Sequence, residues 1–347
     1  MTKPLYKQII DDLVAAIESG QLPVGAKLPT EKELSLTYGV SRITSKRALT
    51  ELETSGLITR TQGKGSYVQA QKINSSLTPK LLFLIPFAND LSLGNFNEGL
   101  APVIASHHYD VVLSSTEFLV NKQAEDLMQE FSGMIYYAHQ TDDFLDTLFE
   151  LSLADFPVII LDKKIHDLSY PTIQSDNFAG GEMATTYLMA KGHQRIAYIF
   201  GETALPQSVR QRYLGYLHAT KKYQLPFRTA RTDQAAFLSD HTVDYLLSNH
   251  VTGVICENDL VAIALMKKAK QAQVAIPEAL SVFGFDNIQA AALVDPPLST
   301  IAQNFKQMGQ LAGELLIQWI EQGQRPADQQ IAVEKIIRHS TKERTHE

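Results

Sequence analysis

The chain has 347 residues, of which 44% are hydrophobic and 20% are charged. This length predicts two or three domains, and the composition excludes an intrinsically disordered chain. The one cysteine, Cys256, excludes an intrachain disulfide and a cysteine-only metal site, and it agrees with a reducing cytoplasm. The sequence begins with an amphipathic segment and contains no run of about 18 apolar residues, so we expect neither a signal peptide nor a membrane span.

The charge is distributed unevenly along the chain. The formal net charge of −7 argues against a partner as acidic as nucleic acid. Residues 1–70, however, hold nine Lys and Arg against seven Asp and Glu, whereas the remainder holds 22 against 31. The two ends are therefore predicted to serve different partners, although so small a positive balance can also arise by chance.

Three short helices are predicted at the beginning of the chain. Apolar residues recur at helical spacing over residues 5–17, which predicts a first helix. Thr30 lies three residues before Glu33, the spacing of a capping box, and predicts a second helix that runs to Tyr38. Ser41 is a favourable N-cap for a third helix after a tight turn.

The third helix and the segment after it are typical of a DNA reader. Arg42 and Lys46 lie four residues apart and share a face, with Thr44 and Arg47 beside them. Cations and hydroxyls at the exposed start of a helix can bind phosphates and base edges in a major groove. The hairpin predicted over residues 61–66 carries one lysine between two glycines and can enter a minor groove. The alternative interpretation is a solvated face of an ordinary helix.

Residues 4–69 resemble the winged helix of the GntR family. The matching segments are 5–6, 17–20, 28–31, 40–42, 48–49 and 62–65. The resemblance implies DNA contacts by Thr30, Glu31, Ser41, Arg42, Thr44, Ser45, Lys46, Arg47, Gln62, Gly63, Lys64 and Gly65. Thr30 replaces the commoner serine, Ser45 the usual valine and Lys46 the usual arginine. Because lysine lacks the planar fork of arginine, the resemblance implies DNA binding but leaves the base preference open.

A linker and an α/β body are predicted after the winged helix. Residues 70–79 are polar and predict a hinge. From residue 80, short apolar runs such as 81–85 and 158–161 alternate with helical stretches. This pattern predicts doubly wound parallel sheets covered on both faces, with a ligand beyond the carboxyl ends of the strands.

Residues 80–340 resemble the two-lobed effector domain of the LacI/GalR family, which is related to periplasmic binding proteins. The matching segments are 175–177, 180–181, 192–197, 212–216, 258–259, 277–286 and 296–301. The resemblance implies that the chain crosses between two lobes near residues 173, 302 and 326. Residues 341–347 are then a C-terminal tail.

The same resemblance implies a sugar site. Arg212 and Asp259 stand where the family binds ligand hydroxyls, and Asp162, directly after its strand, is a third match. An arginine fork and carboxylate oxygens can hold vicinal diols in complementary pairs. Three further candidates follow strands or align with a stacking aromatic residue of relatives: His139, Asn89 and Gln234.

Other motifs are expected to have ordinary structural roles. The pair Gly180-Gly181 lacks the spacing and the lysine of a phosphate loop, and it favours tight helix packing. The pair His107-His108 is expected on the surface, since adjacent histidines rarely bind one metal ion. No catalytic constellation stands out, so we expect no enzymatic activity, no metal and no cofactor.

The combination of the two domains resembles that of repressors of arabinose utilisation. It implies a cytoplasmic homodimer that binds palindromic operator DNA and is released by a small sugar, with L-arabinose or another pentose as the first candidate. The same architecture could instead sense a hexose, a purine or a sugar phosphate. A phosphate stays open because Lys163, Lys164 and Arg210 lie near the predicted cleft. A sugar-binding receptor without DNA function and an enzyme are the remaining alternatives.

Overall fold

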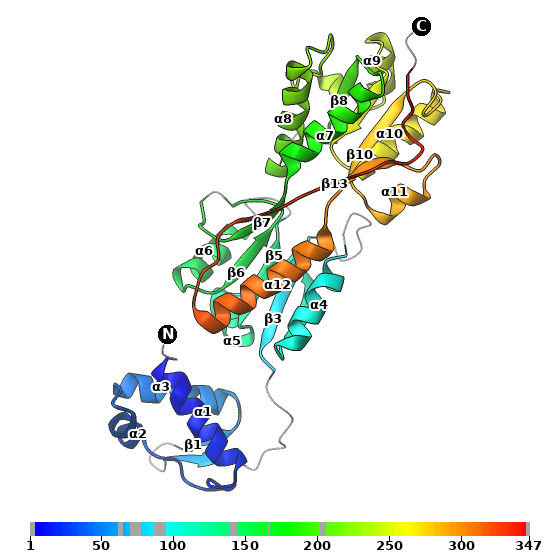
Figure 1. Ribbon diagram of the computed structural model, residues 1–347. Helices are drawn as coiled ribbons and strands as arrows, with labels where there is room; N and C mark the ends of the chain where they lie inside the picture. Colours follow the sequence, from blue (N-terminus) through cyan, green and yellow to red (C-terminus); the bar gives the residue numbers. More distant parts are fainter. Residues whose placement is uncertain are drawn as a thin grey trace. The chain divides into compact units, whose positions relative to one another are not determined.

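The computed structural model describes residues 4–61, 65–69, 78–86, 95–138, 144–165, 167–201 and 206–344 (Figure 1). The chain divides into two compact units, Met1–Thr78 and Pro79–Glu347. Among the described residues, no helix combines the length and the apolar character needed to cross a membrane.

The N-terminal unit is a winged helix. It contains α1 (Leu5–Glu18), α2 (Glu31–Tyr38) and α3 (Arg42–Thr54), followed by the antiparallel strands β1 (Ile58–Thr61) and β2 (Gly65–Val68). Apolar side chains from all three helices and from β1 form its core: Ile9, Leu13, Leu34, Leu49, Leu52 and Ile58. Their burial holds α3 against the other two helices.

Local hydrogen bonds set the ends of α2 and α3. The Glu33 amide donates to Thr30 Oγ1 at 3.3 Å and the Thr30 amide donates to Glu33 Oε2 at 2.7 Å, so the predicted capping box is present. Gly39 ends α2 with a φ of 64°, in the left-handed region that favours glycine. The Thr44 amide donates to Ser41 Oγ at 3.2 Å. These caps determine where the predicted recognition helix begins.

The second unit consists of two lobes, each built on its own sheet. The N-lobe sheet is parallel, in the order β12-β7-β6-β5-β3-β4. Its strands are β3 (Lys80–Ile85), β4 (Asp110–Ser115), β5 (Gly133–Tyr137), β6 (Val158–Leu161), β7 (Thr172–Ser175) and β12 (Gln329–Ile331). Its helices are α4 (Phe96–Ser106), η1 (Thr116–Leu119), α5 (Ala124–Glu130), α6 (Leu145–Leu153) and α12 (Phe305–Gln322).

The C-lobe sheet has the order β13-β11-β10-β9-β8 and is parallel except for the edge strand β13. Its strands are β8 (Ile196–Ile199), β9 (Gly253–Cys256), β10 (Ser281–Asp286), β11 (Ser299–Ala302) and β13 (Glu334–Ile336). Its helices are α7 (Asn177–Ala190), α8 (Gln207–Lys222), η2 (Gln234–Ala236), α9 (Thr242–Ser248), α10 (Asp259–Gln271) and α11 (Gln289–Leu293). The predicted α/β class with parallel sheets is confirmed.

The chain crosses between the lobes three times (Figure 1). The crossings lie between β7 and α7, between β11 and α12, and between β12 and β13. The third therefore falls at residues 332–333, later than the expected position near 326. Beyond β13, the Lys342 amide donates to Ser281 Oγ at 3.1 Å, so part of the expected tail packs on the C-lobe.

The surroundings of Gly181 and of the pair His107-His108 agree with ordinary structural roles for these residues. A Cβ on Gly181 would lie 2.0 Å from the Arg212 carbonyl oxygen, so glycine lets α7 and α8 approach closely. His107 and His108 are exposed, and His107 Nδ1 lies 3.5 Å from Glu321. Within the described part of the chain, no three His, Cys, Asp or Glu side chains are grouped so that they could hold a metal ion.

Candidate functional site

Two exposed cations and an exposed apolar side chain lie near the start of α3. Arg42 is the first residue of α3, Lys46 follows one turn later, and both are exposed. Ile43, which the sequence pattern did not single out, is 80% exposed. Arginine and lysine can bind guanine or phosphate, and an apolar side chain can contact a thymine methyl group. We call Arg42, Ile43 and Lys46 the reading face.

Ser45 lies on the opposite side of α3. Its side chain is completely buried, in the helix phase that also buries Leu49 and Leu52. Its hydroxyl lies 3.5 Å from the Ser41 carbonyl oxygen. The prediction that Ser45 contacts DNA is therefore corrected, because the Ser45 side chain packs into the core of the winged helix.

Two further expected DNA contacts are engaged within the N-terminal unit. The Arg47 guanidinium lies 4.0 Å from the centre of the Tyr6 ring, and its Nε lies 3.3 Å from Glu51. Glu31 forms an ion pair with Arg60 of β1. These contacts join α1 to α3 and α2 to the wing, so both side chains have structural roles beside any contact with DNA.

The wing is described only in part. Gly65 begins β2 with a φ of 113°, and a Cβ there would lie 2.8 Å from Lys27 Cε. The positive φ favours glycine at this position, whereas the flexible Lys27 side chain could move aside. Gln62, Gly63 and Lys64, the expected contacts at the tip of the wing, lie outside the described residues.

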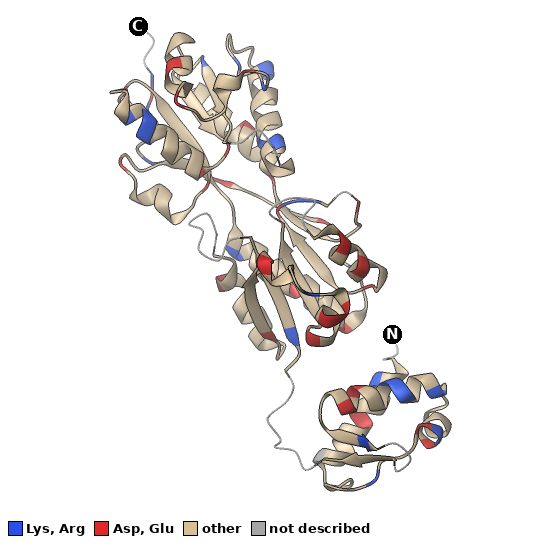
Figure 2. Ribbon diagram, turned by 180° about the vertical axis from the view of Figure 1, so that it is seen from behind, with Lys and Arg blue, Asp and Glu red and all other residues tan. Residues whose placement is uncertain are grey.

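The two units differ in the distribution of charge. Figure 2 shows acidic residues gathered on the N-lobe, whereas Lys and Arg are interspersed with acidic residues on the winged helix. Helices α5 and α6 alone carry Glu125, Asp126, Glu130, Asp146 and Glu150. An acidic surface repels DNA, which makes the N-lobe unsuited to bind it.

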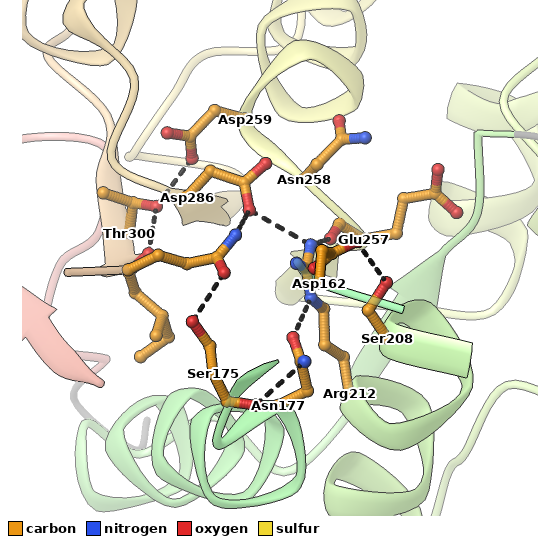
Figure 3. Close-up of polar contacts among 12 residues, drawn as sticks. Asp162, Ser175, Asn177, Ser208, Arg212, Glu257, Asn258, Asp259, Asp286 and Thr300 are labelled. Carbon is orange, nitrogen blue, oxygen red and sulfur yellow. Dashed lines mark hydrogen bonds and ion pairs between the residues drawn. The ribbon is translucent and has the colours of Figure 1, made fainter. Parts of the chain in front are cut away.

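Arg212 lies at the centre of a polar cluster in the second unit (Figure 3). It comes from α8 and is only 5% exposed. Its Nε donates to Asn177 Oδ1 at 2.8 Å, and its Nη1 donates to the Glu257 carbonyl oxygen at 2.6 Å. The same Nη1 lies 3.2 Å from Asp286 Oδ1, and the guanidinium stacks on Phe285 at 3.8 Å. Arg212 is thus held rigidly at the carboxyl ends of the C-lobe strands.

Asp286 is the main residue of this cluster that the sequence analysis missed. It ends β10 with a φ of 109°, and its Oδ1 accepts a hydrogen bond from Gln303 Nε2 at 2.6 Å. Burial raises the pKa of Asp286 to about 6, although Arg212 acts in the opposite direction. Its place directly after a predicted strand was the available signal, but Asp259 shares that signal.

Asp259 lies next to Asp286 on the side away from Arg212 and is completely buried. Its Oδ1 accepts from the Thr300 hydroxyl at 2.6 Å, and its Oδ2 accepts from the Ile288 amide at 2.9 Å. A Cβ on Gly284 would lie 2.1 Å from Asp259 Oδ1. Because both oxygens are used inside the lobe, the expected contact of Asp259 with ligand hydroxyls is corrected. Asp259 instead holds the turn that presents Asp286.

The burial of Asp259 predicts a pH-dependent stability. Burial raises its pKa to about 7, so the folded chain binds a proton near neutral pH that the unfolded chain releases. We expect this group to add about 2 kcal/mol to the free energy of unfolding as the pH falls from about 8 to 5, and to lose it as the pH rises again. Asp259→Asn can still accept from Ile288 and donate to Thr300. Over this pH range, urea unfolding should show a smaller rise in the free energy of unfolding for Asp259→Asn than for the natural chain, because Asp286 still contributes in both. Equal rises in the two chains would contradict the assignment.

Asp162 joins the cluster from the N-lobe. It follows β6 with a φ of 68°, and its Oδ2 accepts from Ser208 Oγ of α8 at 3.3 Å, so this hydrogen bond links the two lobes. Its Oδ1 is buried and has no hydrogen-bond partner among the described residues. Burial would lower the pKa of Arg212, yet Asp286 and Asp162 together raise it. A buried carboxylate oxygen without a partner is unfavourable, and a ligand hydroxyl would satisfy it.

The remaining expected ligand residues are not part of this cluster as described. Gln234 begins η2 and is exposed, and no described contact joins it to Arg212. The nearby aromatic rings of Phe200 and Phe237 stack on each other at 5.2 Å. His139 and Asn89 lie outside the described residues.

Both units match known protein families. Residues 5–68 match the bacterial regulatory proteins of the gntR family, and residues 185–341 match a periplasmic binding protein-like domain. The chain therefore combines a gntR-family winged helix with a periplasmic-binding-protein-like effector domain, as the sequence predicted. It is a transcriptional regulator of the LacI/GntR type.

Individual relatives are similar to this chain over most of its length. It is 28% identical to the arabinose metabolism transcriptional repressor of Geobacillus stearothermophilus over 361 residues, which cover 99% of both chains. It is 27% identical to the repressor CytR of Escherichia coli, over 90% of this chain and 96% of that protein. A LacI family regulator of Enterococcus faecium with bound ribose superposes with a TM-score of 0.64 at 26% identity, over 77% of this chain and all of that one. These relatives are transcriptional regulators and not enzymes.

Proposed function

We propose that this protein represses genes of pentose utilisation by binding palindromic operator DNA as a homodimer, and that a free pentose releases it. L-Arabinose is the first candidate for the effector. The observation that supports sugar binding is Asp162 Oδ1, which is buried without a hydrogen-bond partner among the described residues and lies in the cluster of Arg212 and Asp286. The DNA half is supported by the reading face of α3 and by the similarity to arabinose repressors.

The charges of the cluster favour an uncharged ligand. Asp286 and Asp162 already compensate Arg212, and the Lys164 ammonium lies 2.7 Å from Asp328. A phosphate would bring further negative charge to a site that already holds buried carboxylates. Hydroxyl groups, in contrast, can donate to carboxylates and accept from the guanidinium. The cluster therefore supports a free sugar rather than a sugar phosphate.

The effector can be identified by ligand-dependent stabilisation. In a thermal-shift screen of pentoses, hexoses, their phosphates and nucleobases, we expect a free pentose at about 100 times its Kd to stabilise the chain by about 2.7 kcal/mol. Asp162→Asn should abolish most of this stabilisation, because an amide replaces the carboxylate that would accept from the ligand hydroxyls. A response to phosphates or nucleobases alone would contradict the pentose proposal.

The proposed binding of DNA by α3 can be tested with a pair of substitutions on this helix. Arg42→Ala removes an exposed cation of the reading face, so we expect weaker binding to any duplex and a log–log salt slope reduced by about one unit. Ser45→Ala, three residues away in the core, is the matched control and should change neither quantity. Fluorescence anisotropy over a range of salt concentrations measures both. An unchanged slope for Arg42→Ala would remove Arg42 from the interface.

A further inference from the structure

A closed ring of polar contacts connects the ligand cluster to the chain crossings. Ser175 ends β7 immediately before the first crossing, and Gln303 directly follows β11 in the second. Ser175 Oγ donates to Gln303 Oε1 at 2.7 Å, and Gln303 Nε2 donates to Asp286 Oδ1 at 2.6 Å. Arg212 and Asn177 complete the ring, since Asn177 Nδ2 donates to the Ser175 carbonyl oxygen at 3.0 Å.

Gln303 occupies a special place in this ring. Its side chain is 8% exposed, and both ends of its amide group are bound, one by a residue of the other crossing and one by Asp286. If this amide turned over, its oxygen would face the Asp286 carboxylate and that hydrogen bond would be lost, although the Ser175 hydroxyl could then accept instead of donate. Its orientation therefore couples Ser175 to Asp286.

Asp286 has one oxygen available for a ligand. Within the described residues, Gln303 and Arg212 both bind its Oδ1. A sugar hydroxyl that donates to Oδ2 would turn the carboxylate or draw charge from Oδ1, and either effect changes its bond to Gln303. Because Gln303 is held at its other end by Ser175, such a change reaches two of the three crossings.

We propose that Gln303 and Ser175 are positioning residues that transmit ligand binding at Asp286 to the crossings between the lobes. This role rests on the proposed function, because it requires a ligand that hydrogen-bonds to Asp286. In this role Gln303 does not contact the ligand. Gln303 makes the geometry of two crossing segments depend on whether the Asp286 carboxylate is bound by a ligand.

Ser175→Ala separates transmission from binding. It removes the hydroxyl that joins the crossings but leaves the bonds of Gln303 and Arg212 to Asp286. With L-arabinose as the probe, calorimetry on the full chain should give an affinity within about threefold of the natural protein. Hydrogen exchange should show that the sugar protects residues 173–177 in the natural chain, and that this protection falls about tenfold in the variant. Full protection in Ser175→Ala overturns the proposal.

Gln303→Glu gives a second, pH-dependent readout. The introduced carboxylate can still accept from Ser175, but when ionised it cannot donate to Asp286. Among the described residues, Asp286 and Arg212 belong to the ring, Asp162 acts on Asp286, and Lys306 lines the same pocket as Gln303. L-Arabinose affinity should fall about tenfold near pH 8 and recover toward pH 5, where a proton shared between the introduced carboxyl group and Asp286 restores the donor.

The affinity of the natural chain for L-arabinose should not rise in this way as the pH falls. If the affinity of Gln303→Glu does not recover toward pH 5, the proposal is contradicted. Thr341→Ala is the control, because it removes a similarly buried hydroxyl that bonds to Ser299 at 3.1 Å in the C-lobe. It should leave both affinity and protection unchanged.

Separate results would contradict the proposed role of the ring and the proposed identity of the effector. If no free pentose binds the natural chain, the proposed effector is wrong. The ring still predicts, without any sugar, that Ser175→Ala raises hydrogen exchange about tenfold at residues 173–177 and 302–305. Unchanged exchange at both crossings would overturn the ring itself.

Discussion

Arg212→Met should lower the free energy of unfolding by about 3 kcal/mol and abolish sugar binding. The substitution preserves much of the apolar stem but leaves Asp286 buried without its cation, and it removes the donors to Asn177 and to the Glu257 carbonyl oxygen. Because Asp286 can take up a proton, the loss should be smaller at pH 5 than at pH 8. Urea unfolding at the two pH values and calorimetry with L-arabinose measure these effects.

Arg210→Met is the matched control for this prediction. Arg210 lies on the same helix, α8, but is exposed, so its substitution should change stability by only a few tenths of a kcal/mol. The double substitution Arg212→Met with Asp286→Asn removes both charges and should recover part of the lost stability. Equal losses in Arg210→Met and Arg212→Met would contradict the central role of Arg212.

Gly215→Ala should destabilise the C-lobe by about 1–3 kcal/mol or more and weaken sugar binding as well. A Cβ at this position would lie 2.1 Å from the Phe178 carbonyl oxygen, and backbone atoms cannot move aside as a flexible side chain can. Helix α8 would have to move away from α7, beside which it lies in Figure 1, and this would pull Arg212 from Asn177. Thermal unfolding and calorimetry measure the two losses.

The neighbouring position supplies the control. Leu214 is on the same turn of α8 and is 45% exposed, so Leu214→Ala should leave sugar affinity unchanged and cost less than Gly215→Ala. If Gly215→Ala bound L-arabinose as the natural chain does, the close approach of α7 and α8 would not be what positions Arg212.

Features that depend on neighbouring residues could be predicted from the sequence. The capping box of Thr30 and Glu33 and the N-cap at Ser41 need only residues three positions apart, and both are present. Most of the parallel strands were predictable because they contain short apolar runs between helical stretches, whereas β7, β11 and β12 are at least half polar and were not predicted. Ser45 replaces the usual valine and was expected to contact DNA, but the helical phase of α3 places it in the core.

The ligand cluster was harder to predict because it depends on distant segments. Asp259 and Asp286 both follow strands of the C-lobe, and the sequence does not show that Thr300 and the Ile288 amide use both oxygens of Asp259. Gln303 lies 128 residues from its partner Ser175, and no local pattern joins them. Motif similarity singled out Arg212 as a ligand contact, which stays a prediction, and its partners inside the cluster required the fold.

The three crossings have a consequence for how the chain is made. The winged helix is complete after residue 68, whereas the N-lobe sheet needs β12 and the C-lobe sheet needs β13, both of which are synthesised last. Domains fold as units from the N-terminus during synthesis. A chain terminated before residue 329 would therefore carry a finished winged helix on two unfinished lobes. Such a truncated chain would keep the unit proposed to bind DNA but lack the folded lobes proposed to respond to the sugar.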